Sequence, residues 1–290
     1  MIEEKRRLLI DTRFTSPGAI AEVAQGRQRP PTLQGDEKIL VVAADHSARG
    51  MLGVGRDAFA MENRYDLLDR LCVALANPGV HGVLGTPDIV EDLMLLGALE
   101  NKLVFGSMNR GGLPGSVFEL DDRFGGYDAR SIVEAALDGG KMLLRINYAA
   151  AATADTLEAC AQAVTRLAAA KKVAMIEPFL SVNSDGRVRN VLTADAVIQS
   201  MAIASALGTT SAYTWLKVPV VDNMERVAEA TTLPIVLLGG DRNDRPDEMF
   251  GSWEAALRLP GVRGLTVGRN LLYPRDNDVA GAVKTAVSLL

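Results

Sequence analysis

The chain has 290 residues, of which 48% are hydrophobic and 23% charged, and it carries a net charge of −5 at pH 7. This length can bury one large core, and the composition excludes a disordered chain or an aromatic-rich recognition module. The acidic balance argues against nucleic acid or an anionic membrane as partner, and no apolar run approaches the roughly 18 residues of a membrane span.

After a leader of residues 1–37, β-branched apolar runs alternate with helical stretches rich in alanine and leucine. Eight strands are predicted, at residues 39–44, 82–84, 102–106, 142–146, 173–177, 213–217, 234–238 and 264–267. Eight helices are predicted between and after them, at residues 62–76, 87–97, 129–138, 153–170, 193–207, 223–230, 247–257 and 279–289. Thr153 and Thr193 suit helix N-caps, and Pro87 suits a first helical turn.

This alternation predicts an α/β fold with parallel strands, because each parallel connection needs a helical crossover. A count of eight units closes a (β/α)8 barrel, the TIM-barrel fold. We expect one domain over residues 1–290, with residues 1–37 as an N-terminal extension. The cysteines, Cys72 and Cys160, lie in helical patterns and indicate reduced thiols in a cytoplasmic protein, whose start lacks a signal-peptide core.

Polar residues gather where the predicted strands end, although the strands themselves are apolar. In such barrels the active site is built from the residues that leave the C-terminal ends of the strands. The pattern is therefore typical of an enzyme. The polar strand-end positions are Asp45, His46, Ser107, Asn109, Arg110, Arg145, Asn147, Glu177, Lys217, residues 239–241, Gly268 and Arg269.

Lys217 ends the sixth predicted strand, in the segment YTWLKVPV. Burial and nearby cations lower the pKa of a lysine, and the neutral amine attacks ketones and aldehydes. The alternative is a structural salt bridge to Glu177 or Asp45. Strict alternation also places Tyr213 and Trp215 on the face of Lys217, so a small residue opposite or a bulge is needed to fit both rings into the barrel.

The chain resembles the class I, Schiff-base aldolases of the superfamily that contains deoxyribose-phosphate, tagatose-bisphosphate, archaeal-type fructose-bisphosphate and sulfofructose-phosphate aldolases. The resemblance is carried, in chain order over residues 39–272, by VVAADHS, GGKMLLRINY, AMIEPF, WLKVPV, LLGG and GLTVGRNLL. Within the superfamily the chain looks most similar to actinobacterial aldolase-like proteins associated with inositol catabolism.

The resemblance implies that Lys217 forms the imine and that Asp45 and Glu177 are catalytic carboxylates beside it. It places Arg145 near a lysine of the fourth strand in relatives, with a register that can slip by one residue. Independently of the resemblance, cleavage needs a proton donor and an acceptor close to the substrate oxygen. The alternatives are a loop cap for Asp45, a salt bridge for Glu177 and a purely structural role for Arg145.

Two glycine-rich strand ends predict a phosphate site. Gly239 and Gly240 follow the seventh strand, and Gly268 and Arg269 follow the eighth, which is the usual phosphate position in this fold. Glycines let backbone amides approach an oxyanion, a following helix N-terminus adds a favourable dipole, and an arginine adds a charge-assisted fork. The alternative is that these glycines serve only tight turns.

Two loops near this predicted site have no assigned role. The glycine-rich connection 107–128 is long enough for a lid or a binding loop, and residues 241–248 form a charged insert. Arg49 and Arg110 are candidates to bind a second anionic group of the substrate, or are ordinary surface arginines.

These observations predict an aldehyde-lyase without metal or other cofactor, acting on a phosphorylated keto-sugar or keto-sugar acid. The inositol association suggests cleavage of 6-phospho-5-dehydro-2-deoxygluconate to dihydroxyacetone phosphate and malonate semialdehyde. The alternatives are a metal-dependent lyase or isomerase using Asp45, His46 and Glu177, and a non-catalytic sugar-phosphate-binding protein. The expected partner is a small phosphorylated sugar, with no nucleic acid or membrane partner, and we expect a homo-oligomer.

Overall fold

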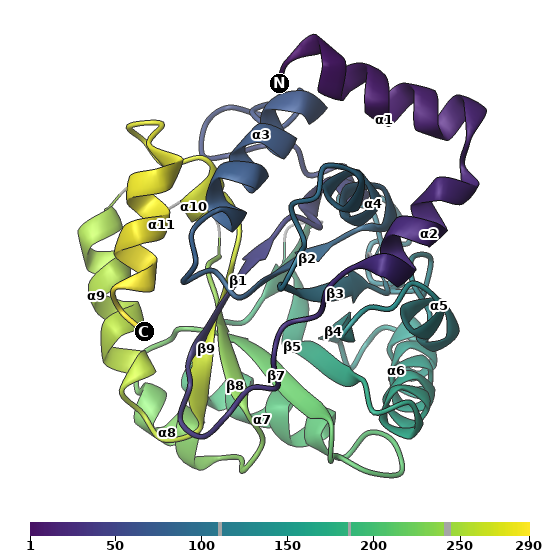
Figure 1. Ribbon diagram of the computed structural model, residues 1–290. Helices are drawn as coiled ribbons and strands as arrows, with labels where there is room; N and C mark the ends of the chain where they lie inside the picture. The colour runs from purple at the N-terminus through teal and green to yellow at the C-terminus, as the bar shows by residue number, and fades with distance from the viewer. Residues whose placement is uncertain (110–111, 185–186, 241–244) are drawn as a thin grey trace.

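A parallel β-barrel forms the centre of the computed structural model, which describes residues 1–109, 112–184, 187–240 and 245–290 (Figure 1). Within these residues eight parallel strands follow each other in the order β4-β3-β2-β1-β9-β8-β7-β5, and pairing of β4 with β5 closes the ring. The predicted (β/α)8 TIM barrel is confirmed. The barrel strands are β1 Ile39–Ala43, β2 Gly82–Gly85, β3 Leu103–Ser107, β4 Gly139–Ile146, β5 Val173–Ser184, β7 Thr214–Pro219, β8 Ile235–Leu238 and β9 Val262–Val267.

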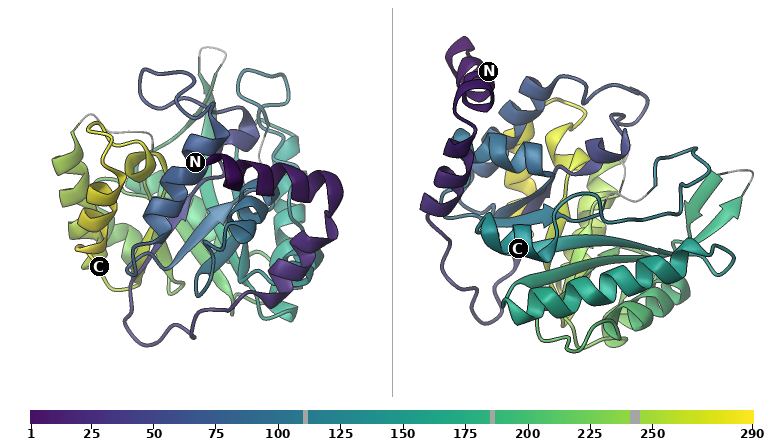
Figure 2. Two further views of the ribbon diagram at one scale, coloured as in Figure 1. Left: turned by 45° about the horizontal axis from the view of Figure 1, so that its top comes forward. Right: turned by 90° about the vertical axis from the view of Figure 1, so that its right-hand side faces the viewer.

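Helices surround the barrel and cover the outer faces of the strands (Figures 1 and 2). All eight predicted helices are present, with shifts of at most a few residues at their ends. They are α3 Arg64–Leu75, α4 Pro87–Leu95, α5 Ala129–Glu134, α6 Ala152–Ala169, α7 Ala194–Ser205, α8 Met224–Glu229, α9 Pro246–Leu257 and α11 Val279–Val287. Two short turns of helix not predicted from the sequence follow β1 and β9, namely η1 His46–Arg49 and α10 Arg269–Leu272.

The predicted helix starts are correct in two of three cases. Thr193 caps α7 by accepting a hydrogen bond from the backbone N–H of Ala196, and Pro87 lies in the first turn of α4. The prediction for Thr153 is wrong. Its hydroxyl bonds the backbone of Asn147 in the preceding loop instead, and α6 begins one residue earlier after Ala151.

The leader of residues 1–37 contains two helices that the sequence did not predict, α1 Glu3–Thr15 and α2 Gly18–Gly26. They pack along α4 at the side of the barrel, and they lie away from the projecting hairpin in Figure 2. Leu9 of α1 and Ala24 of α2 are buried in the main hydrophobic cluster. Arg27 is also buried and donates to the backbone carbonyls of three residues, Leu99, Lys102 and Ala136. The extension is therefore an integral part of the packed structure.

Strand β4 begins three residues before its predicted start, at Gly139. A side chain at Gly139 would place Cβ 2.5 Å from the carbonyl oxygen of Val173 on β5, and one at Gly140 would meet the sulfur of Met108 at 2.3 Å. The two glycines are thus required by close packing within the barrel and not by a turn. As a consequence Lys141 lies inside the barrel wall.

Strand β5 continues beyond the barrel and forms a hairpin with the antiparallel strand β6 Arg187–Asn190. The hairpin projects from the end of the barrel in the right-hand view of Figure 2. Its base is joined by a hydrogen bond of 2.8 Å from the hydroxyl of Ser181 to Oδ1 of Asn190. The extension brings Asn190 to the mouth of the barrel.

The barrel interior is filled by a separate apolar cluster that includes Ala43, Phe105 and Trp215. The rings of Phe105 and Trp215 lie 5.7 Å apart in a tilted arrangement. Trp215 therefore does enter the barrel together with Lys217, as the alternation predicts, while Tyr213 precedes the start of β7. None of the helices in the described part of the chain is long and apolar enough to cross a membrane.

Candidate active site

A cavity of about 600 Å³ opens at the C-terminal ends of the barrel strands, within the range of small-molecule sites. Seven of the eight residues predicted for the site line it, and Arg145 does not. The lining residues from that prediction are Asp45, Glu177, Lys217, Gly239, Gly240, Gly268 and Arg269. Arg49 and Asn109, also named in the sequence analysis, line the same wall. The structure adds Lys141, Asn190, Trp253 and Thr266, among others.

Two lysines and two carboxylates form a contiguous cluster at the floor of the cavity. Nζ of Lys217 lies 3.3 Å from Oε2 of Glu177, and Nζ of Lys141 lies 2.5 Å from the same oxygen. Lys141 also contacts Oδ2 of Asp45 at 3.2 Å, and the hydroxyl of Ser107 donates to that oxygen. All four charged side chains are at least 89% buried. Lys141 thus bridges both carboxylates, whereas Lys217 contacts only one.

This difference in contacts separates the pKa values of the two lysines. Burial is the largest cause acting on Lys217 and lowers its pKa, the charge of Lys141 lowers it further, and Glu177 only partly opposes both. Burial also disfavours the charged form of Lys141, but Asp45 and Glu177 together outweigh it and raise the pKa of Lys141. Lys217 is therefore the lysine that more readily becomes a neutral amine.

The carboxylates of the cluster stay ionised. Burial alone would raise the pKa of Asp45 and of Glu177, but the neighbouring lysines outweigh it and lower both pKa values. For each carboxylate Lys141 is the larger attractive charge and Lys217 the second. The site therefore holds two anionic bases next to a lysine with a lowered pKa.

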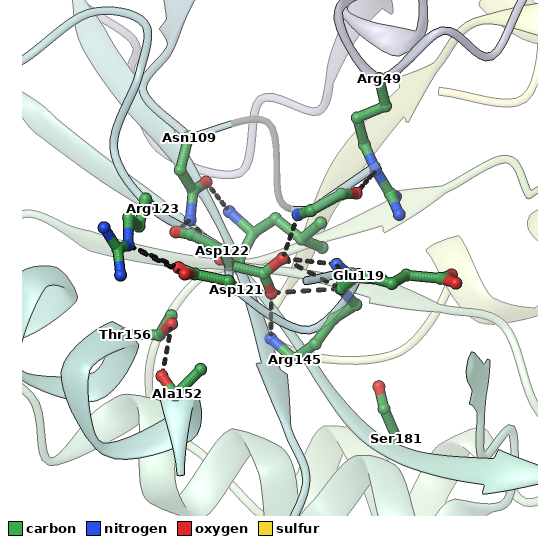
Figure 3. A network of polar contacts seen from close by, with 12 residues as sticks. Arg49, Asn109, Glu119, Asp121, Asp122, Arg123, Arg145, Ala152, Thr156 and Ser181 are labelled. Carbon is green, nitrogen blue, oxygen red and sulfur yellow. Dashed lines mark hydrogen bonds and ion pairs between the residues drawn. The ribbon is translucent and has the colours of Figure 1, made fainter. Parts of the chain in front are cut away.

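The structure places Arg145 away from this cluster. Arg145 is on the same face of β4 as Lys141 but four residues further along, about 13 Å at 3.3 Å per residue. There it forms an ion pair with the fully buried carboxylate of Asp122 in the β3–α5 loop (Figure 3). The strand-4 cation beside Lys217 and Glu177 is Lys141, which sequence analysis missed because it placed the start of the strand at Met142.

The predicted phosphate end of the cavity is formed by the loops after β8 and β9. Gly240 has a left-handed backbone with φ of +66°, and a side chain at Gly268 would place Cβ 2.2 Å from the carbonyl oxygen of Ala43. Glycine is thus required at both positions. Nη2 of Arg269 donates to the carbonyl of Gly240 at 3.3 Å, which holds the guanidinium against this loop.

Two further polar groups lie near the same end. His46 is buried beside Asp45, and burial lowers its pKa to about 4, although Asp45 opposes the shift. His46 is therefore neutral at physiological pH. The hydroxyl of Thr266 is buried in the cavity wall, and within the part of the chain that the structure describes it has no hydrogen-bond partner.

Arg49 also lines the cavity, whereas Arg110 and residues 241–244 of the charged insert lie outside the described residues. The connection 107–128 is held to the barrel by Asn109, whose side chain bonds both backbone groups of Leu143. Over the described ranges, no group of three or more histidine, cysteine or acidic residues is arranged to hold a metal ion.

Residues 37–287 match the sequence profile of a protein family described as Cgl0159-like. The crystal structure of Cgl0159 from Corynebacterium glutamicum is 55% identical in sequence and superposes with a TM-score of 0.96, covering 100% of this chain and 97% of that chain. A comparison with curated protein sequences gives no significant match.

More distant similarity is found to solved aldolase structures. An archaeal fructose 1,6-bisphosphate aldolase is 15% identical, with a TM-score of 0.66 over 93% of this chain and 98% of that chain. A fructose-bisphosphate aldolase from Slackia heliotrinireducens is 13% identical, with a TM-score of 0.64 over 98% of this chain and 84% of that chain. At these identities the similarity establishes the shared barrel fold.

Proposed function

The chain belongs to the Cgl0159-like family, and from the geometry of its lysine–carboxylate cluster we propose that it is a class I aldolase. The observation that carries the proposal is that the different contacts of Lys217 and Lys141 shift their pKa values in opposite directions. Lys217 has a lowered pKa and touches one carboxylate, whereas Lys141 is held as an ammonium ion between two. A metal-independent aldolase needs one lysine of the first kind, because only the neutral amine is a nucleophile.

In the proposed reaction the neutral amine of Lys217 adds to the keto carbon of the substrate, and the carbinolamine loses water to give an iminium ion. A carboxylate takes the proton of the hydroxyl group on the carbon β to the iminium carbon, and the bond between the α and β carbons breaks. Its electron pair moves into the iminium group and leaves an enamine, and the aldehyde departs. Protonation of the enamine and addition of water then release the second product and restore the free lysine.

The carboxylates suit different proton transfers in this sequence. Glu177 contacts Lys217 directly, so we assign to it the protons exchanged at the lysine nitrogen and the carbinolamine oxygen. Asp45 is kept ionised by Lys141 and accepts a hydrogen bond from Ser107, and we assign to it the substrate hydroxyl proton. Lys141 keeps both carboxylates anionic and helps to keep Lys217 neutral.

The proposed substrate is a phosphorylated keto-sugar or keto-sugar acid, with its phosphate against Gly239, Gly240, Gly268 and Arg269. The support for this placement is the cavity that joins these residues to Lys217. The first substrate to test is 6-phospho-5-dehydro-2-deoxygluconate, which would give dihydroxyacetone phosphate and malonate semialdehyde. Its support is the sequence resemblance to inositol-associated aldolase-like proteins. We also propose that the chain is cytoplasmic and forms a homo-oligomer.

Trapping of the imine tests the proposal. Incubation with dihydroxyacetone phosphate and sodium cyanoborohydride should attach the reduced substrate to Lys217, detected by peptide mass spectrometry. Lys217→Met should abolish both the adduct and cleavage of the ketose phosphate, whereas the matched variant Lys284→Met, at an exposed position of α11, should retain both. Cleavage activity that survives in Lys217→Met, or absence of an adduct with every ketose phosphate tried, would contradict the mechanism.

A further inference from the structure

Arg49 places a second positive charge in the cavity wall. It lies at the end of η1, is half-buried, and its Nε donates to the carbonyl of Gly112 at 3.4 Å. In Figure 3 its two terminal nitrogens have no contact with the residues drawn, and for the described residues no ion pair with a carboxylate is found for it. An arginine fork that stays open in a cavity wall is suited to bind a carboxylate or a phosphate with two parallel hydrogen bonds.

Arg49 follows β1, the neighbour of β9, but its guanidinium reaches towards the loop after β3. Arg269 follows β9, and the glycine pair at 239–240 follows β8. Arg49 contacts Gly112 of the loop after β3, and the charge of Arg145 on β4 acts on it. Two strands separate β9 from β3 and two separate β8 from β4, so these pairs face each other across the ring. Lys217 on β7 reaches the cavity floor between the two ends.

A buried hydrogen-bond network fixes the position of Arg49. The carboxylate of Asp122 accepts the N–H of Gly112 at 3.3 Å and is bonded by the guanidinium of Arg145 at 2.6 Å (Figure 3). Gly112 thus donates its N–H to Asp122 and accepts with its carbonyl from Arg49. A Cβ at position 112 would lie 2.0 Å from the carbonyl oxygen of Phe118, so only glycine fits at this point of the loop.

The other charges of the cavity leave Arg49 available to an anion. Both carboxylates of the floor contact Lys141, and among the described residues neither forms an ion pair with Arg49. Glu248, a further acidic residue of the wall, forms an ion pair with Arg245 at 2.9 Å and is largely exposed. Burial lowers the pKa of Arg49 because it removes water from the charged guanidinium. A bound anion would offset this loss of hydration.

We propose that Arg49 binds a second anionic group of the substrate, on the half that leaves as the aldehyde, and that Asp122 and Arg145 are its positioning residues. This inference rests on the proposed aldolase function and sharpens it. The substrate carries an anion at each end of its chain, with the reacting ketone between them, and the released aldehyde is itself a carboxylate or a phosphate ester. Neutral aldehydes are then poor partners in the reverse condensation.

The reverse reaction tests this assignment with three aldehydes of different charge. Dihydroxyacetone phosphate is condensed with malonate semialdehyde, with glyceraldehyde 3-phosphate and with neutral propanal, and kcat/KM is measured for each. A charge-assisted hydrogen bond contributes about 1.5–3 kcal/mol, or roughly 10- to 100-fold. Arg49→Gln should lower kcat/KM by that factor for the preferred anionic aldehyde, chiefly through KM, and by less than about threefold for propanal. The anion with the larger loss identifies the group bound.

The controls separate binding from folding and from the aldolase proposal itself. Arg123→Gln removes an exposed arginine of the same loop and should change none of the three reactions. Asp122→Asn should raise KM selectively for the anionic aldehyde, which a loss of folded protein alone would not do. Equal losses with charged and neutral aldehydes would overturn the role of Arg49. A trapped imine at Lys217 without preference for charged aldehydes overturns only this inference, whereas the absence of any imine overturns the aldolase function.

Discussion

Replacement of Glu177 by glutamine should separate imine formation from bond cleavage. The carboxylate lies 3.3 Å from Nζ of Lys217, so its attraction amounts to about 5 kcal/mol at an effective dielectric constant of about 20. The glutamine amide oxygen keeps only part of this attraction. We therefore expect Glu177→Gln to lower the pKa of Lys217 further. Lys141 keeps its second partner, Asp45.

The assay is the pH dependence of imine trapping with dihydroxyacetone phosphate and cyanoborohydride between pH 5.5 and 10. A lower pKa makes the amine neutral at lower pH, so the midpoint of the trapping profile should move down. The rate of cleavage should fall by roughly 10²–10⁴-fold, because a proton carrier is lost. Glu248→Gln, which removes an exposed carboxylate of the same cavity paired with Arg245, should move neither quantity. An unchanged midpoint, or one that moves up, would refute the argument that Glu177 holds a proton on Lys217.

Three further predictions concern the framework around the site. Asp122→Asn should lower the free energy of unfolding by about 3–5 kcal/mol, because it leaves the buried guanidinium of Arg145 uncompensated. Asp121→Asn, in the more exposed pair with Arg123, should cost less than about 1 kcal/mol. Urea unfolding measures both, and equal effects would contradict the prediction. His46 has a pKa lowered to about 4, so its Cε1 proton resonance should stay constant between pH 5.5 and 8 and move only below that range; titration near 6.5 would show that its environment is wet. Gly139→Ala should destabilise the protein by about 1–3 kcal/mol through overlap with a backbone carbonyl, whereas Gly125→Ala, with open space around it, should lie within about 0.5 kcal/mol of the parent in thermal unfolding.

The barrel itself could be predicted because its signal is periodic. Apolar runs that alternate with amphipathic helices leave few other folds open, and the residues that end the strands must then meet at one rim. This argument brought Asp45, Glu177 and Lys217 together correctly as neighbours in space. The periodic pattern could not predict contacts outside the alternating strands and helices. Examples are the packing of Leu9 and Ala24 from the leader and the hairpin that continues β5.

The strand-4 residue shows why local patterns were insufficient. The predicted strand starts at Met142 and leaves Lys141 outside, and a Gly-Gly pair before an apolar run is by itself typical of a turn. The structure needs both glycines for close approach to Val173 and Met108, a requirement that depends on residues more than 30 positions away in either direction along the chain. Arg145 was predicted as a site residue because it lies near the end of the apolar run. Its partner, Asp122, comes from a loop whose position no periodicity determines.

Lys141 and Arg145, the two cations of β4, have different roles at this end of the barrel. Lys141 and Arg145 point to the same side of β4, one turned to the floor of the cavity and the other to the loop above it. The first contributes to the lowered pKa of Lys217, and the second bonds Asp122, which holds the loop that carries the contact to Arg49. A single strand thus sets both the reactivity of the lysine and, if Arg49 binds the aldehyde half, the charge of the substrate that reaches it. Changes at position 141 should therefore alter the pH dependence of the reaction, and changes at position 145 its selectivity among aldehydes.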